Sequence, residues 1–186
     1  MKKILLLAAG FCFLSLSLLA QALPAVDKSP MDMSYYPANY PSLKVQDKMT
    51  EAIVARVIYS RPKKEGRPVF GGIVEYGKVW RLGANEATEV EFYKPVKING
   101  KKIAKGRYTL YAIPNENSWT LILNKETDTW GQFKYDAKKD VLRMNVPVEK
   151  TSATAESLGM YFGKTLAGFE LVIGWDNIKV AMPISL

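Results

Sequence analysis

Apolar and polar residues alternate with a period of two along much of the chain after residue 49. This pattern indicates β-strands with one buried face, because successive side chains of a strand point to opposite sides. The clearest alternating segments are 89–93, 141–148, 169–175 and 178–184. A further strand is expected at 53–59, which is rich in β-branched residues, and another at 160–162.

Turn residues separate these strands at short intervals. Asn99-Gly100 stands between two short apolar segments and predicts a hairpin, because a type I′ turn needs positive φ at both central residues. Lys105-Gly106 and then Pro114 to Asn117 mark the next two turns. We expect an antiparallel meander of three strands, at 101–103, 107–113 and 119–123. Trp175-Asp176-Asn177 is interpreted as a tight connection between the last two strands.

About nine or ten short strands without crossover helices predict an all-β fold. The first choice is a single-domain antiparallel β-sandwich over residues 49–186, and the second is a β-barrel. At most one or two short helical turns are expected, near 80–86 or 127–135. Residues 23–48 are rich in Pro, Tyr and Met without a clear period. We expect them to form an extended arm that lies on the domain or acts as a mobile leader.

The first 22 residues have the pattern of a secretory signal peptide. Lys2-Lys3 precedes an apolar run over 4–20, and Ala20-Gln21-Ala22 has the small residues that a signal peptidase requires. A transmembrane helix is the alternative, but the run is just short of a full span. Cys12 lies inside the apolar run, which argues against a lipid anchor. The pattern therefore predicts an exported protein, periplasmic or extracellular, and soluble after cleavage.

Composition narrows the chemistry available to the exported chain. The sequence has no His, and its one Cys is Cys12, in the expected signal peptide. Catalysis by His or Cys, disulfides and the usual zinc sites are therefore excluded, and we expect no metal and no cofactor. Lys and Arg number 26 against 18 Asp and Glu, a formal charge of +8. The basic groups at 63–67, 101–107 and 138–139 look scattered in sequence. A solvated surface is therefore expected rather than a nucleic-acid interface, and attraction to an acidic glycan or an anionic envelope surface is the weaker interpretation.

The densest set of candidate binding residues lies in one glycine-containing loop. Arginine offers five fixed donors, asparagine a donor and an acceptor, and tryptophan a flat apolar face, which together suit a small polar ligand or a sugar. The candidates are Trp80, Arg81, Asn85 and Glu86, with Arg61 and Arg67 from the preceding loop. The alternative is structural: Arg81 pairs with Glu86 or Glu89, Trp80 fills the core, and Asn85 caps a turn.

A second loop combines aromatic and polar residues. Asp128, Trp130 and Tyr135 could stack on or bind a sugar, or the aromatic rings could close the core. A glycoside hydrolase would need two carboxylates facing each other across a cleft. Glu86, Glu89, Asp128 and Asp176 are the available acids, and the sequence does not show which of them meet.

Three stretches of the sequence form a specific combination. They are Tyr59-Ser60-Arg61-Pro62 with Gly66 to Gly72, then Tyr76 to Thr88, and Gly106 to Leu110 with Ile113-Pro114. Taken together, they resemble the exported bacterial family catalogued as domain of unknown function 2911. The similarity runs from about Ala52 to the C-terminus and includes Asn124, Trp130-Gly131 and Trp175-Asp176. It implies an exported globular β domain and brings no assigned function. Residues 31–36 match no pattern of that family.

Three functional hypotheses remain open on these observations. The first is a non-catalytic binding module for a small polar ligand or glycan in the cell envelope. The second is a carboxylate-dependent hydrolase acting on envelope or dietary glycans. The third is an interaction protein whose N-terminal arm adds to a sheet edge of a protein partner.

Overall fold

Ten β-strands form antiparallel sheets in the computed structural model, which describes residues 23–186. The largest sheet has the order β1 (Met31–Tyr36), β2 (Ala55–Ser60), β3 (Glu89–Phe92), β6 (Gly106–Pro114), β7 (Ser118–Asn124) and β8 (Asp140–Pro147). Two long strands, β9 (Glu149–Thr165) and β10 (Gly168–Ile184), form a second sheet. A small hairpin consists of β4 (Val96–Ile98) and β5 (Lys101–Ile103).

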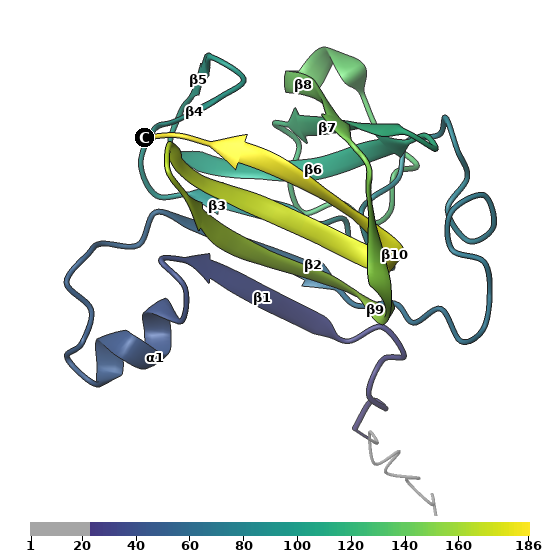
Figure 1. The fold of residues 1–186 in the computed structure, drawn as a ribbon, viewed down its shortest axis with the longest axis horizontal. Helices are drawn as coiled ribbons and strands as arrows, with labels where there is room; N and C mark the ends of the chain where they lie inside the picture. Colours follow the sequence, from purple (N-terminus) through teal and green to yellow (C-terminus); the bar gives the residue numbers. More distant parts are fainter. Residues whose placement is uncertain (1–22) are drawn as a thin grey trace, which may run out of the picture.

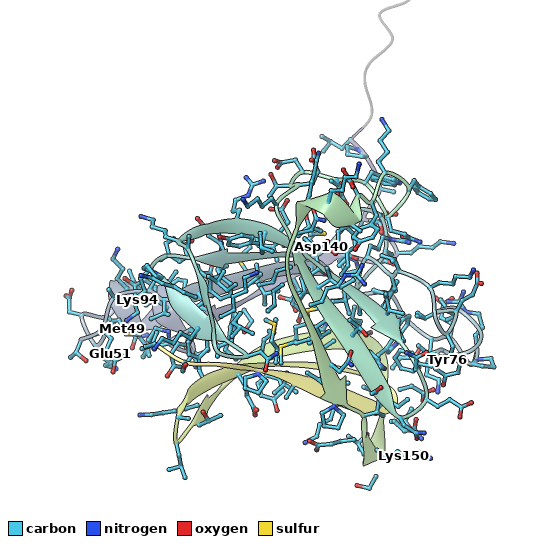
Figure 2. All side chains as sticks on the ribbon, turned by 90° about the horizontal axis from the view of Figure 1, so that it is seen from above. Met49, Glu51, Tyr76, Lys94, Asp140 and Lys150 are labelled. Carbon is cyan, nitrogen blue, oxygen red and sulfur yellow. The ribbon has the colours of Figure 1, made fainter. Side chains whose placement is uncertain are left out.

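The two larger sheets pack face to face and enclose the core. Figure 1 shows β9 and β10 lying across the larger sheet, and Figure 2 shows the same two layers from above, with side chains filling the space between them. Alternate residues of every layer point inward, including Val57 and Val90 from one sheet and Leu171 and Ile173 from the other. The sandwich prediction is therefore confirmed, and the second-choice closed barrel is not formed.

The Asn99-Gly100 hairpin forms as predicted. Asn99 has φ 49° and Gly100 has φ 74°, which is the positive pair that a type I′ turn requires. The predicted meander is correct only for β6 and β7, because β5 pairs with β4 alone and β6 pairs with β3 on its other side. The β4–β5 hairpin is thus an insertion between β3 and β6, which pair with each other.

The last two expected strands are one continuous strand, β10, so the prediction of a tight connection at Trp175-Asp176-Asn177 is wrong. The pairing of β10 with β9 shifts register around Asp176, which has φ 55°. This is a β-bulge, and an aspartate accommodates positive φ there for the same reason that it favours turns. Trp175 stays in the core and donates from Nε1 to the carbonyl of Glu156 on β9, at 3.1 Å.

Part of the expected N-terminal arm belongs to the larger sheet. Met31–Tyr36 is its edge strand β1, paired antiparallel with β2 from Met31 opposite Ser60 to Tyr36 opposite Ala55. A short helix, α1 (Tyr40–Val45), follows with a proline in its first turn. The other short helix is η1 (Ala137–Lys139), capped by Asp136. The two short helices agree with the expected limit of one or two, but neither lies in 80–86 or 127–135, the segments proposed for them.

Candidate functional site

The loop that contains most candidate residues is hydrogen-bonded to the part of β6 that does not pair with β3. Trp80 exchanges both backbone hydrogen bonds with Ala112, at 2.7 and 2.9 Å. Thr88 closes the loop, because its N–H donates to the carbonyl of Arg81 and its hydroxyl to that of Leu82. Position 83 requires glycine because the backbone passes close to Ser60, and a Cβ there would lie 2.6 Å from Oγ of Ser60. The loop is therefore a closed, rigid element.

Trp80 belongs to the core rather than to an open surface. Its ring packs edge-on against Trp119, with centroids 5.8 Å apart, and stacks near Trp175 at 6.1 Å. Its Nε1 donates to the carbonyl of Gly83 at 3.2 Å. Of the two interpretations of Trp80, the geometry therefore favours the structural one, in which the residue fills the core. Trp80 is also one of the residues that line a small hollow.

Arg81 lines the same hollow and has no acidic partner among residues 23–186. Its guanidinium makes one hydrogen bond to a side chain, from Nη1 to Oε1 of Gln132 at 3.2 Å. Its Nε is buried and has no acceptor. Burial in this position lowers the pKa of Arg81, because desolvation penalises the charged form. The expected ion pair of Arg81 with Glu86 or Glu89 is therefore absent from the described part of the chain.

The hollow beside Arg81 has a volume of about 150 Å³. A cavity of this size accepts one small molecule such as benzene. Trp80, Trp175 and Val74 supply apolar walls, and Gln132 stands beside the arginine. Two exposed charges, Glu75 and Lys78, stand at the edge. The arrangement combines a partly buried cation, an amide and aromatic walls, which suits a small ligand with an anionic group.

Asn85 and Glu86 face the second candidate loop. Asn85 has φ 59°, and its carbonyl accepts from the N–H of Gly131 at 2.9 Å. Glu86 is exposed and forms an isolated backbone bridge with Trp130, whose side chain is 62% exposed. The two loops that the sequence treated as separate candidates are therefore joined. These residues do not line the hollow beside Arg81.

The two arginines of the preceding loop are held elsewhere. Arg61 donates to Asp32 of β1 at 3.0 Å and to the carbonyl of Leu158 on β9 at 3.1 Å, which ties the two sheets together. Arg67 is exposed and wraps its guanidinium onto the carbonyls of Lys63 and Lys64, both at 2.9 Å. Neither residue lines the hollow beside Arg81.

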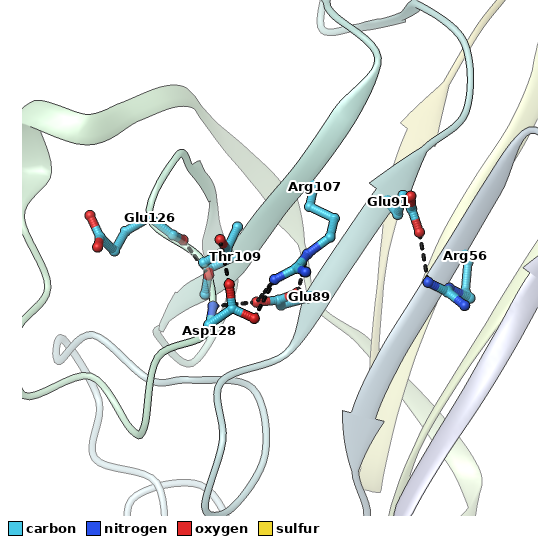
Figure 3. A network of polar contacts seen from close by, with 8 residues as sticks. Arg56, Glu89, Glu91, Arg107, Thr109, Glu126 and Asp128 are labelled. Atoms are coloured by element: carbon cyan, nitrogen blue, oxygen red, sulfur yellow. Dashed lines mark hydrogen bonds and ion pairs between the residues drawn. The ribbon is translucent and has the colours of Figure 1, made fainter.

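A second hollow, of about 290 Å³, lies on the outer face of β2, β3 and β6. Alternating charges cross these strands, as Figure 3 shows. Arg56 pairs with Glu91 at 2.7 Å, and Arg107 pairs with Glu89 at 2.9 Å and also with Asp128.

The ion pairs among Arg56, Glu91, Glu89, Arg107 and Asp128 form a charged ladder. This ladder bears on the hydrolase hypothesis. Arg107 lowers the pKa of Asp128, chiefly through its hydrogen bond to the carboxylate. A general acid needs the opposite shift, and Glu89 shares the same guanidinium. Asp176 lies on β10 of the other sheet, and its Oδ1 is paired with Nζ of Lys64 at 2.6 Å. The ladder thus favours a structural role for Asp128.

Tyr135 closes a small apolar cluster on the outer face of β6 and β7. Its ring packs edge-on against Tyr111, with centroids 5.1 Å apart. Its hydroxyl donates to Asp140 at 2.6 Å and accepts from Arg143. Desolvation first and the hydrogen bond to Asp140 second raise the pKa of Tyr135 to about 12. Of the two interpretations of this residue, the geometry supports closure of the core.

The raised pKa of Tyr135 predicts a specific loss of stability at high pH. The unfolded chain releases this proton near pH 10 and the folded chain only near pH 12. This contribution to stability is therefore complete below pH 10 and is lost as pH rises to 12. Solvent screening reduces its size, because the phenol is only partly buried. We expect urea unfolding of Tyr135→Phe to show a shallower decline over this range than the wild type, and equal slopes in the two proteins would contradict the prediction.

The hollow contains residues that the sequence does not mark as a site, including Val74, Trp175 and Gln132, the hydrogen-bond partner of the Arg81 side chain. Gln132 lies 51 positions from Arg81, within the second aromatic loop. No local pattern marks it, because its role depends on the bridge that brings the two loops together. Only the position of Trp130-Gly131 next to it in sequence could have drawn attention to this stretch.

These observations define an antiparallel β-sandwich with a small polar hollow at a loop fixed to β6. Residues 41–184 match the model of the family described as "Protein of unknown function (DUF2911)", and the chain belongs to that family. The comparison with curated proteins found no match. The comparison with solved structures found none either.

Two structural features are absent from residues 23–186. No helix in this part of the chain is long and apolar enough to cross a membrane. No group of three or more Asp or Glu side chains gathers there as metal ligands would. The predicted signal peptide lies outside the described residues.

Proposed function

We propose that the protein is an exported, non-catalytic binding module that holds a small polar ligand, or the end of a glycan, through an anionic group. The observation that carries this proposal is the partly buried guanidinium of Arg81, which faces a hollow without an acid to pair with it. The N-terminal sequence pattern supports export to the periplasm or the outside of the cell.

The physical argument is one of charge compensation. A partly buried cation without an ion-pair partner raises the free energy of the folded state, because it has lost part of its hydration and gained no counter-charge. A carboxylate entering the hollow would restore that charge pairing, and arginine binds carboxylates with two parallel hydrogen bonds. The volume of about 150 Å³ is that of a cavity that holds one benzene, so the hollow would enclose a small acid or the carboxylate end of one acidic sugar unit.

The rest of the ligand would contact the walls of the hollow. Gln132 offers an amide that can hydrogen-bond a sugar hydroxyl, and Trp175 and Val74 offer apolar contact. Glu75 at the edge would repel a second anionic group placed there. A singly charged sugar acid such as glucuronic acid therefore fits this chemistry better than a multiply charged one.

Replacement of Arg81 tests the proposal. We expect wild-type protein to bind glucuronate in isothermal titration calorimetry and not the neutral sugar glucose. Arg81→Met should weaken binding about 10- to 100-fold, the range for losing a hydrogen bond to a charged group. Arg67→Met removes the same charge from an exposed loop and should bind like the wild type.

The stability of the same variants separates a binding arginine from a structural one. Arg81→Met also removes the buried Nε that lacks an acceptor, so we expect its free energy of unfolding to stay within about 1 kcal/mol of the wild type. A large loss of stability with no effect on ligand binding would show that Arg81 only holds the loop. Absence of binding to any small carboxylate would also refute the proposal.

A further inference from the structure

Lysines that are distant in sequence surround one hollow. Lys101 and Lys102 of β5 lie on one side, and Lys125, Lys138 and Lys139 lie on the other, beside η1. Figure 1 shows the β4–β5 hairpin and the start of β8 rising at the same end of the molecule. The space between them has a volume of about 380 Å³. We call it the lysine cleft.

The lysine cleft has few acids to balance its charge. Lys139 pairs with Glu126, and Asp140, the one acid that lines the cleft, is already shared by Asn124, Tyr135 and Arg143. The other four lysines of the cleft are all exposed and have no ion-pair partner among residues 23–186. The local excess of positive charge is therefore a property of the fold, since the sequence alone shows these groups as scattered.

Backbone contacts hold both sides of the cleft in place. On the hairpin side, Lys97 of β4 exchanges two hydrogen bonds with Ser185, at 2.8 and 2.9 Å. On the other side, the N–H of Lys125 donates to the carbonyl of Lys139 at 2.9 Å. Each side of the cleft is therefore anchored to neighbouring backbone, which reduces the backbone entropy lost when a ligand binds there. We call the β5 side and the side of Lys125 and η1 the two ridges of the cleft.

We propose that the lysine cleft binds a chain-like acidic polysaccharide, with its carboxylate or sulfate groups between the two ridges. Lysine ammonium groups act as point charges and tolerate anions at varied positions, as a repeating acidic polymer presents them. An extended polymer can lie along the cleft and contact lysines on both sides, whereas a flat membrane surface would contact only the outermost lysines.

The chemistry of the cleft argues against nucleic acid as the occupant. Single-stranded nucleic acid binds through aromatic side chains that stack on its bases as well as through basic residues. The aromatic residue of the cleft, Tyr108, is buried and donates its hydroxyl to the carbonyl of Ala104 at 3.0 Å. The cleft therefore offers charge without a stacking surface.

Charge reversal on both ridges tests the proposal. Fluorescence anisotropy of the purified protein with labelled heparin oligosaccharide supplies a sulfated probe, and oligogalacturonate supplies a carboxylated one. Lys101→Glu combined with Lys138→Glu changes one residue on each ridge, and we expect Kd to rise about tenfold or more. The dependence of log Kd on log salt should also become shallower, because fewer counterions are released.

A matched double variant outside the cleft supplies the control. Lys94→Glu with Lys164→Glu gives the same net charge at two exposed positions and should change Kd less than twofold. An equal loss in both double variants would mean diffuse attraction and would overturn the proposal. So would tighter binding of single-stranded DNA or of vesicles containing anionic lipid, or no binding of either polysaccharide at low salt. All four positions are exposed, and an unchanged melting temperature verifies the fold.

Discussion

Trp119→Ala is expected to lower the free energy of unfolding by about 3–5 kcal/mol, the range for removing a large buried aromatic side chain. Trp119 is fully buried and lies at the centre of the aromatic cluster between the sheets. The centroid of its ring lies 5.1 Å from that of Phe70 and 5.8 Å from that of Trp80. Because Trp80 also walls the hollow beside Arg81, the cavity left in Trp119→Ala should weaken ligand binding too. Chemical denaturation followed by circular dichroism measures the first effect.

Substitution of tryptophan by phenylalanine separates packing from hydrogen bonding in the same cluster. Trp119 has a buried Nε1 with no acceptor, whereas Nε1 of Trp175 donates to the carbonyl of Glu156. Removing an unsatisfied donor offsets part of the lost packing, so Trp119→Phe should cost less than Trp175→Phe, by about 1–2 kcal/mol. If Trp119→Phe proved the more damaging of the two, the account of this cluster would be wrong.

Asn124→Asp is the second substitution with a large expected effect, about 2–4 kcal/mol. Asn124 is buried at the end of β7, where its Nδ2 donates to the carbonyl of Asp136 at 3.0 Å and to Oδ1 of Asp140 at 2.7 Å. Its Oδ1 accepts from the N–H of Glu126 at 2.9 Å. An aspartate has the same shape, but it cannot donate and would place a second carboxylate against Asp140.

The matched control for Asn124→Asp is Asn145→Asp. Asn145 is exposed on β8, and its Oδ1 accepts from Thr120 at 2.7 Å, which an aspartate can also do. We expect its free energy of unfolding to stay within about 0.5 kcal/mol of the wild type. Asn124 joins the segments that carry Lys125 and Lys139, so Asn124→Asp should also weaken polysaccharide binding at the lysine cleft. Equal stability of the two variants would contradict the role given to Asn124.

Features that depend on neighbouring residues could be predicted from the sequence. The Asn99-Gly100 hairpin follows from the positive φ that both positions adopt, and the alternation at 89–93 follows from one core-facing and one outer face of β3. In both cases the physical cause lies within a few residues. The family similarity rests on the same local stretches, and the family model covers residues 41–184.

Features that depend on distant partners could not be predicted. Met31–Tyr36 alternates apolar and polar residues only briefly, and its two methionines are exposed, so the alternation does not mark a core-facing side. The segment becomes β1 because β2 offers it an edge to pair with. Asp176 has the chemistry of a turn residue and forms a bulge because β9 continues past it. The candidate site behaves in the same way: the sequence marks Trp80 and Arg81, but only the fold shows that Trp80 is buried and that Gln132 lies beside Arg81.

The guanidinium of Arg81 itself offers the most direct test of the proposed binding function. Two-dimensional ¹H–¹⁵N spectra resolve arginine Nε–Hε groups, and the assignment of Arg81 follows from its disappearance in Arg81→Lys. We predict that glucuronate shifts this one signal and slows its exchange with water, while glucose leaves it unchanged and the Arg67 signal does not move. An Arg81 signal that stays fixed at saturating glucuronate, or that moves together with every exposed arginine, would contradict the account.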